Sequence, residues 1–348
     1  MLTRLASQTH EALFRVDDAQ YGLCGFIALH TTAAGPVAGG LRIYPYADED
    51  AAIRDALELS RNMTFRTAAL DLPLGGGSAV VPFDPSREDI QGRLCAMGRA
   101  IEALEGQFWA TNDMGACENA MAQLAAETRF LATVDDSEAD GPPSVRLAAA
   151  STFNAIRIGA SYRFGSDDLA GRCVAVQGVG HVGWDLCLLL RQSGVNLVVA
   201  DPDPVLLTGA VHAFGARMST PRTICSTTVD ILAPCSVGGV INARSIPSIG
   251  AGLIAGAAIN QLDREQDADS LHERGILYLP DYLVNGGGII HPASRILGIH
   301  DSADWIDRKM AELFQTLQSI LSAAKAANLS PWTLSNRMIR DRLRTYAG

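Results

Sequence analysis

The sequence has 348 residues, of which 48% are hydrophobic, 19% charged and 6% aromatic. At about 150 residues per domain this length predicts two domains, and the apolar content excludes a mostly disordered chain. The net charge of -10 argues against a nucleic-acid backbone or an anionic membrane surface as the partner. No apolar run reaches the ~18 residues that a membrane span needs.

The N-terminal segment and the spacing of the cysteines indicate in which cellular compartment the protein is expected. The N-terminus lacks the apolar stretch of a signal peptide. The seven cysteines are widely spaced and form no C-x-x-C pair, which favours reduced thiols over a disulfide framework or a zinc site. We therefore expect a soluble, cytoplasmic protein without a metal centre.

The first third of the chain alternates β-like runs with a helix-like segment. Leu23–Leu29 and Val37–Tyr44 are predicted strands. A helix is predicted over Ala47–Asn62, and the residues on its apolar face are Ile53, Leu57 and Ser60. Gly75–Gly77 predicts a turn that leads into a further apolar run.

A domain boundary is predicted at Asp135–Pro143, which is acidic, poor in apolar residues and ends in two prolines. We expect residues 1–140 to form a substrate and oligomerisation domain, completed by about residues 325–348. Residues 141–324 are expected to form the second domain.

The second part shows regular β-α-β alternation after a helical stretch over Ala148–Tyr162. The predicted strands are Cys173–Val176, Val195–Ala200, Asp230–Ala233, Leu253–Ala257 and Ile276–Leu279. Buried parallel strands separated by helices are typical of a doubly wound α/β sheet.

Two helices are predicted near the C-terminus. Apolar residues recur at helical spacing from Ile306 to Ala324, a stripe that indicates core or subunit packing. Ser330-Pro331 supplies an N-cap and a first-turn proline for a last helix that reaches about Arg344.

A dinucleotide-binding fingerprint follows the first strand of the second part. The run Gly178-Val179-Gly180-His181-Val182-Gly183 has the G-x-G-x-x-G pattern and opens an apolar helix. The next strand ends at Asp201, whose carboxylate can accept hydrogen bonds from ribose hydroxyls and repels a 2′-phosphate. No Lys or Arg follows before Arg217, so the pattern favours NAD over NADP. The alternatives are a glycine turn that binds nothing and, for His181, a spacer.

Four segments of the first part are candidates for the substrate site, because Gly- and Pro-rich turns can hold polar groups close to a ligand. They are Gly35-Pro36-Val37-Ala38-Gly39-Gly40, Met63-Thr64-Phe65-Arg66, Leu74-Gly75-Gly76-Gly77-Ser78 and Thr111-Asn112-Asp113-Met114-Gly115. On their own they could be plain turns.

In this order and spacing, the four segments resemble the leucine/phenylalanine/valine branch of the amino-acid dehydrogenase family, which also includes glutamate dehydrogenase. The resemblance continues through the fingerprint and through residues 233–240, 255–260 and 275–291, and covers roughly Gly22 to Leu343. It implies an α/β fold in which a Rossmann NAD-binding domain closes over a cleft to an α/β substrate domain. It also implies oxidative deamination of an L-amino acid with NAD, or the reverse reaction from a 2-oxo acid and ammonia, by a homo-oligomer.

The resemblance also implies roles for single residues. Asp113 would be the general acid/base, although a loop or N-cap carboxylate is the plain alternative. Arg66 would hold the substrate carboxylate, Ser78 and Asn260 would orient polar groups, and Gly39 and Gly40 would approach the substrate through their backbone. The cofactor contacts would be the six fingerprint residues with Asp201, Pro202, Cys235, Asn260 and Asn285.

The side-chain pocket in this family is apolar. Ala38 stands where leucine dehydrogenases carry Leu, which would leave room for a bulky or aromatic substrate, although Ala38 could equally be a packing residue. His291 ends a run that resembles the phenylalanine enzymes, and it is either a substitute proton donor or a structural histidine.

Four positions depart from the family pattern. Arg66 replaces a lysine but can still hold a carboxylate. Ser78 replaces the catalytic lysine, and a serine supplies no positive charge beside a developing oxyanion. Ile259 replaces the first Asn of an Asn-Asn pair, and Ala148 replaces a threonine.

Three functions therefore stay open. The first is an NAD-dependent oxidoreductase that acts on a bulky apolar or aromatic amino acid. The second is an imine or 2-oxo acid reductase whose chemistry changed with the loss of the lysine, because hydride transfer itself needs only cofactor, positioning and a proton donor. The third is a catalytically silent, NAD-binding regulatory homologue.

Overall fold

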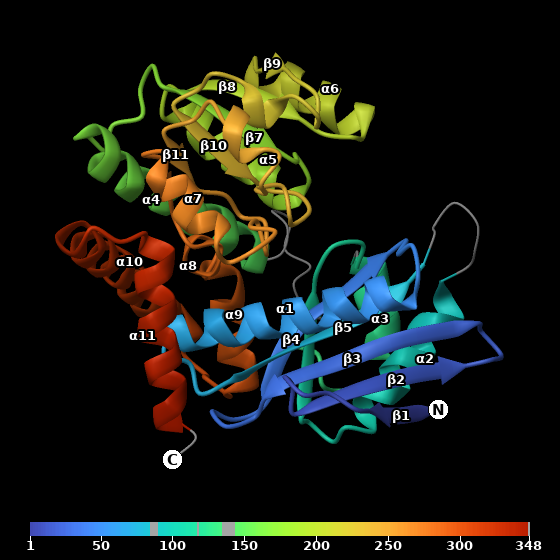
Figure 1. Ribbon diagram of the computed structural model, residues 1–348. Coiled ribbons are helices and arrows are strands. Elements are labelled where there is room, and N and C mark those ends of the chain that lie inside the picture. The colour runs from blue at the N-terminus through green and yellow to red at the C-terminus, as the bar shows by residue number, and fades with distance from the viewer. Residues whose placement is uncertain (84–89, 117, 134–142, 347–348) are drawn as a thin grey trace. The chain divides into compact units, whose positions relative to one another are not determined.

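A computed structural model describes residues 1–83, 90–116, 118–133 and 143–346 (Figure 1). The chain divides into two compact units: Met1–Pro142, Pro292–Ser302 and Asp341–Gly348 form the first, and Pro143–His291 and Ala303–Arg340 form the second. Each unit packs helices on a sheet, which confirms the predicted α/β class. The boundary expected at Asp135–Pro143 lies, apart from Pro143, outside the described residues, and the expected domain limits stay a prediction.

The sheet of the first unit has six strands in the order β1-β2-β3-β5-β4-β6. The strands are β1 (Leu2–Leu5), β2 (Ala12–Asp18), β3 (Leu23–Thr31), β4 (Val37–Tyr44), β5 (Gly75–Pro82) and β6 (Phe108–Asn112). β4 runs parallel to β5 and β6, and the other pairs are antiparallel. The predicted strands Leu23–Leu29 and Val37–Tyr44 are confirmed. The sequence does not predict β1, β2 or β6, whose apolar runs are short or broken by charged residues.

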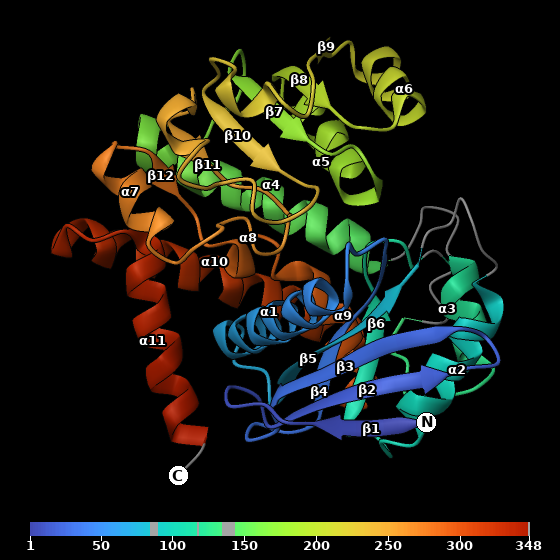
Figure 2. The same ribbon diagram turned by 45° about the vertical axis from the view of Figure 1, so that its right-hand side comes forward.

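Helices cover both faces of this sheet (Figure 2). α1 (Glu49–Ala69) lies on one face, whereas α2 (Gln91–Glu102) and α3 (Glu118–Ala125) share a core with the alternate strand residues on the other. The predicted helix is confirmed but runs on to Ala69. Of its predicted face, Ser60 is buried as expected, but Ile53 and Leu57 are only partly buried, and the other buried residues in this part of the helix are Ala52, Ala56, Leu59 and Met63. The small alanines let α1 pack closely on the glycine-rich strands.

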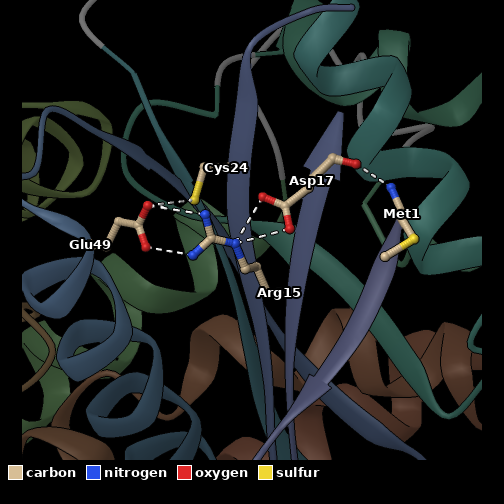
Figure 3. Close-up of polar contacts among 5 residues, drawn as sticks. All are labelled: Met1, Arg15, Asp17, Cys24 and Glu49. Atoms are coloured by element: carbon tan, nitrogen blue, oxygen red, sulfur yellow. Dashed lines mark hydrogen bonds and ion pairs between the residues drawn. The ribbon is translucent and has the colours of Figure 1, made fainter. Parts of the chain in front are cut away.

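Arg15 on β2 ties the outer part of this sheet to the start of α1 (Figure 3). Its Nε lies 2.8 Å from Asp17 Oδ1 and its Nη1 2.5 Å from Glu49 Oε2, and about a third of the Arg15 side chain is exposed. The Cys24 thiol also donates to Glu49, and burial raises the pKa of that thiol to about 11. This arginine therefore bridges two carboxylates near solvent.

The second unit is built on a parallel sheet in the order β12-β11-β10-β7-β8-β9. Its strands are β7 (Cys173–Gln177), β8 (Asn196–Ala200), β9 (Arg217–Met218), β10 (Ile231–Pro234), β11 (Leu253–Ile254) and β12 (Leu277–Tyr278). The helix α4 (Pro143–Phe164) precedes the first of these strands. The helices between the strands are α5 (His181–Gln192), α6 (Pro204–Phe214) and α7 (Asp267–Glu273), with short turns of 3-10 helix at Ile224–Ser226 and Ile246–Ser248. The five predicted strands and the doubly wound architecture are confirmed, although β11 and β12 are shorter than predicted.

Four helices complete the chain: α8 (Asp281–Val284), α9 (Gly287–Ile296), α10 (Ser302–Ala327) and α11 (Pro331–Tyr346). The Ser330 hydroxyl accepts the N–H of Thr333 at 3.1 Å, as the predicted N-cap requires. Near its end, α11 donates from Arg342 Nη1 to Ala68 O at 2.6 Å and from the Tyr346 hydroxyl to Asp71 at 2.9 Å. The last residues thus contact the C-terminal end of α1. Within the described residues, no helix has the length and apolar character to cross a bilayer.

Candidate active site

Glycines bring β4, β5 and α1 of the first unit unusually close together. A Cβ atom on Gly39 would lie 1.8 Å from Gly77 O, and one on Gly76 would lie 2.0 Å from the backbone N of Thr64. Any larger residue would push these elements apart. Two expectations are corrected here: Gly75–Gly77 is the start of strand β5 rather than a turn, and Met63–Arg66 lies within helix α1.

Asp113 lies against Gly40. It follows the last residue of β6, and a Cβ on Gly40 would lie 2.7 Å from Asp113 Cβ and 3.2 Å from its Oδ2. A side chain at position 40 would overlap Asp113, so the close approach of these two residues, which are far apart in the sequence, depends on the glycine. Their pairing as parts of one site is what the sequence predicts.

Asp113 is held by an arginine that itself contacts a second carboxylate. Arg42 Nε donates to Asp113 Oδ2 at 3.0 Å, and Arg42 Nη1 lies 3.1 Å from Asp55 Oδ2. The Tyr46 hydroxyl donates to the same Asp55 oxygen at 2.5 Å. Burial opposes the charge of Arg42, but Asp113 and Asp55 raise the pKa of its guanidinium above the ordinary value. Burial and Asp55 raise the pKa of Tyr46, so its hydroxyl stays a donor.

Ser78 is buried on the face of the sheet that α1 covers. It is two residues beyond Gly76, which faces α1, and residues two apart on a strand share a face. Its side chain is 1% exposed, and the hydroxyl has no hydrogen-bond partner among the described residues. A polar group of this kind is available to a ligand or to an altered neighbour.

Arg66 and Ala38 are both buried. Arg66 is 5% exposed and lies within one helical turn of the Thr64–Gly76 contact. Ala38, on β4, is fully buried, as both the pocket and the packing alternatives require. Their roles stay predictions.

Two histidines pack against α1 near Thr64. The His10 and His30 rings meet edge to face with centroids 4.8 Å apart. His30 Nδ1 lies 2.9 Å from Thr64 Oγ1, and His10 Nε2 lies 2.8 Å from Ser60 Oγ. Burial, with His10 as a second cause, lowers the pKa of His30 to about 4, and burial also lowers the pKa of His10. Both rings are therefore neutral in the fold near neutral pH.

We expect His30 to make the protein less stable in acid. Between pH 6.5 and about 4, the His30 ring binds a proton in the unfolded chain but stays neutral in the folded protein. The free energy of unfolding therefore falls as the pH falls through this range. His30→Gln should reduce the loss of unfolding free energy between pH 7 and 4.5 by about 2 kcal/mol, allowing for partial solvent exposure. Chemical denaturation at both pH values tests this, with exposed His300→Gln as the control. Equal losses in wild type and His30→Gln would contradict it.

The second unit presents an open helix N-terminus at the predicted fingerprint. Gly178 has φ 93°, and a Cβ on Gly183 would lie 2.0 Å from Gly178 O. Gly180 is the N-cap of α5 and has no side-chain cap, and a Cβ there would meet nothing within 4 Å. Free N–H groups over an open space fit a pyrophosphate.

Asp201 connects this loop to the following turn. Its Oδ2 accepts the N–H of Val179 at 2.8 Å, and its Oδ1 accepts the N–H of Asp203 at 2.9 Å. The carboxylate thus stands beside the fingerprint, where a ribose would need it. Pro202 lies in the same turn, before the start of α6.

Three other predicted cofactor residues surround the ends of β10 and β11. The N–H of Cys235 donates to Gln177 O at 2.7 Å, which joins it to the fingerprint strand. Asn260 has φ 55° and its carbonyl accepts the N–H of Gly239 at 2.7 Å. Asn285 donates from Nδ2 to Ala257 O, and its buried Oδ1 has no partner among the described residues. That free acceptor fits an N–H donor of a cofactor.

The positions of His181 and His291 fit more than one of the predicted roles. His181 is exposed at the first position of α5, which fits either a cofactor contact or a spacer. His291 is partly buried in α9, directly before Pro292. The described residues contain no group of three His, Cys, Asp or Glu side chains that could hold a metal ion.

Sequence reasoning missed the residues that hold Asp113. Arg42 is two residues beyond Gly40 on a strand, so the period of two could have placed it on the same face. No local pattern links Asp55 on α1 to β4, because that contact depends on how the helix crosses the sheet.

Two models of one protein family match the sequence. The model described as "Glu/Leu/Phe/Val dehydrogenase, dimerisation domain" matches residues 8–130. The model described as "Glutamate/Leucine/Phenylalanine/Valine dehydrogenase" matches residues 203–330.

Individual proteins are similar over nearly the whole chain. The leucine dehydrogenase of Geobacillus stearothermophilus is 35% identical over 337 residues, which cover 97% of this chain and 91% of the relative. The phenylalanine dehydrogenase of Lysinibacillus sphaericus is 33% identical over 333 residues, covering 94% and 87%. The crystal structure of L-tryptophan dehydrogenase from Nostoc punctiforme is similar with a TM-score of 0.73 and 34% identity, covering 97% of each chain.

Proposed function

The chain belongs to the glutamate/leucine/phenylalanine/valine dehydrogenase family, and from this premise we propose that it oxidises the CH–NH2 group of a bulky apolar or aromatic L-amino acid, or reduces the matching 2-oxo acid or imine. As a member of this family it is an oxidoreductase that uses a nicotinamide cofactor. The observation that carries the proposal is the Asp113 carboxylate against Gly40, because the missing side chain at Gly40 lets a proton-exchanging group lie directly beside the strand backbone.

The second unit would hold the cofactor. The N–H groups around Gly180 would bind the pyrophosphate, Asp201 the adenosine ribose, and Asn285 Oδ1 an N–H donor. Pro202, Cys235 and Asn260 are proposed as further contacts. When bound, the cofactor supplies or accepts the hydride.

NAD is proposed over NADP, because Asp201 would repel a 2′-phosphate. Asp201→Ala should weaken NADH binding about tenfold or more and bring the affinities for NADH and NADPH closer together. Asp203→Ala is the matched control, because Asp203 only caps α6, accepting the N–H of Val205 at 2.8 Å. Fluorescence titration with both cofactors measures the effect. Similar losses in the two variants would argue against a ribose contact at Asp201.

The first unit would hold the substrate. Arg66 would bind the carboxylate, Gly39 and Gly40 would contact it through their backbone, and Asp113 would exchange a proton with the reacting nitrogen or water. A large apolar side chain is proposed because the similar proteins are named for leucine, phenylalanine and tryptophan. Ala38 and, from the second unit, His291 are proposed to lie beside that side chain.

The proposed function is tested by absorbance at 340 nm with purified protein. NAD is combined with each of the twenty L-amino acids, and NADH with 2-oxo acids plus ammonia. Formation of NADH from Leu, Phe or Trp is expected. No turnover in either direction, despite measurable NADH binding, would reject amino-acid dehydrogenation.

Ser78 favours a second candidate, the reduction of a preformed imine. Its uncharged, buried hydroxyl cannot provide the positive charge that assists attack of water on an imine. Hydride transfer to an imine needs no such water. Turnover of imines made from 2-oxo acids and primary amines, without turnover of amino acids, would select this candidate, and NADH binding without any turnover would select a silent regulatory protein.

Self-association and a cytoplasmic location are also proposed. One of the matching family models is described as a dimerisation domain. All six cysteines within the described residues are free, as a reducing compartment predicts.

A further inference from the structure

We propose that Arg42 is the positioning residue of Asp113, and that Asp55 and Tyr46 hold Arg42 in place. This inference rests on the proposed function, because it assigns how the proton-exchanging carboxylate of that site is held. The four side chains form one connected series: Tyr46 donates to Asp55, Asp55 pairs with Arg42, and Arg42 donates to Asp113.

The series holds one oxygen of Asp113 and leaves the other available. Arg42 Nε donates to Oδ2 at 3.0 Å, and no further hydrogen bond to this carboxylate occurs within the described part of the chain. Oδ1 can therefore exchange a proton, while Oδ2 fixes the plane of the carboxylate beside Gly40. A carboxylate on an unsupported turn would rotate among several orientations.

The arginine at position 42 reaches both carboxylates with different nitrogens of one guanidinium. Nε points to Asp113 on the β6 side, and Nη1 contacts both oxygens of Asp55 on α1, at 3.1 and 3.3 Å. These donors belong to one rigid plane, so a fixed Asp55 also fixes the direction of Nε. The Arg42 side chain is only 10% exposed, which keeps the pairs from being screened by solvent.

Arg15 provides a matched comparison in the same unit. It also bridges two carboxylates, one of them on α1, but it lies near solvent and contacts neither Gly40 nor Asp113 (Figure 3). Replacing the Arg15 guanidinium, which pairs with Asp17 and Glu49, should therefore change the stability of the protein and leave its activity unchanged.

The experiment measures kcat, KM and NADH binding for Arg42→Lys, Arg15→Lys and Asp113→Asn, and for Arg42→Lys combined with Asp113→Asn. Arg42→Lys should lower kcat about tenfold or more, with KM and NADH affinity changed less than about threefold. In the Asp113→Asn background the same substitution should change kcat less than about twofold, because the group that it positions is already lost. Arg15→Lys should leave kcat unchanged.

The outcomes separate this inference from the function on which it rests. Equal kcat in Arg42→Lys and Arg15→Lys, or losses that multiply in the double variant, would overturn the positioning role while the dehydrogenase stands. A wild-type protein without turnover would overturn the proposed function and this role with it. If Arg42→Lys does not fold, Tyr46→Phe replaces it: a loss of about threefold in kcat, absent in the Asp113→Asn background, is expected. An unchanged kcat in Tyr46→Phe would contradict the proposal that Tyr46, through Asp55 and Arg42, helps to position Asp113.

Discussion

Replacing Asp113 with asparagine is expected to lower kcat at least about 100-fold, the smaller end of what positioned proton transfer contributes to enzyme rates. An asparagine oxygen can still accept from Arg42 Nε and still fits against Gly40, so the geometry of the turn is kept. The variant loses only the ability to exchange a proton. Initial rates at 340 nm with saturating cofactor measure the loss.

NADH binding should be unchanged in Asp113→Asn, because the proposed cofactor residues belong to the other unit. Asp17→Asn is the control for removing an aspartate paired with an arginine, and it should retain wild-type kcat. A kcat within about threefold of wild type in Asp113→Asn would show that another group exchanges the proton.

Replacing Ser78 with lysine is expected to raise the formation of NADH from Leu or Phe at least about tenfold, because one well-placed charge at a developing oxyanion is worth several kcal/mol. The change removes a hydroxyl that has no partner in the described structure, so no existing hydrogen bond is lost. The ammonium would need a polar neighbour, and the proposed site offers the Asp113 carboxylate.

Ser78→Met separates charge from size. Methionine resembles lysine in length but carries no charge, so it should give no gain in deamination. A folded Ser78→Lys protein that binds NADH and shows no gain would count against the view that the missing charge limits this reaction. Equal gains in both variants would assign the effect to packing.

The fold could be predicted wherever the pattern is local. Val37–Tyr44 is an uninterrupted run with a strand period, and its bounds match the structure. The last turns of α1, which carry Arg66, are harder to predict from the sequence. Met63–Arg66 is surrounded by polar and small residues and precedes the Gly75–Gly77 run, so it resembles a turn. Only packing against Gly76 explains why α1 continues to Ala69.

The candidate residues of the two units differ in the same way in how far they could be predicted. The fingerprint and Asp201 lie within one β-α-β unit, where spacing alone indicates that they meet. Asp113 and Gly40 come from neighbouring strands, and Asp55 comes from a helix that crosses them. Their contacts depend on the strand order β5-β4-β6, which no local pattern reveals.

The contacts of α11 with α1 have a consequence for the order in which the protein is made. Arg342 and Tyr346 hold the end of the helix that contains Arg66, yet they are synthesised more than 270 residues after their partners Ala68 and Asp71. Long-range contacts of this kind close late, since a large loop of chain must first be ordered. On the ribosome, the sheet of the first unit can therefore form early, whereas the end of α1 stays unsupported until the final helix emerges. A nascent chain would form the Gly178–Gly183 loop before the end of the helix that carries Arg66 is held in place.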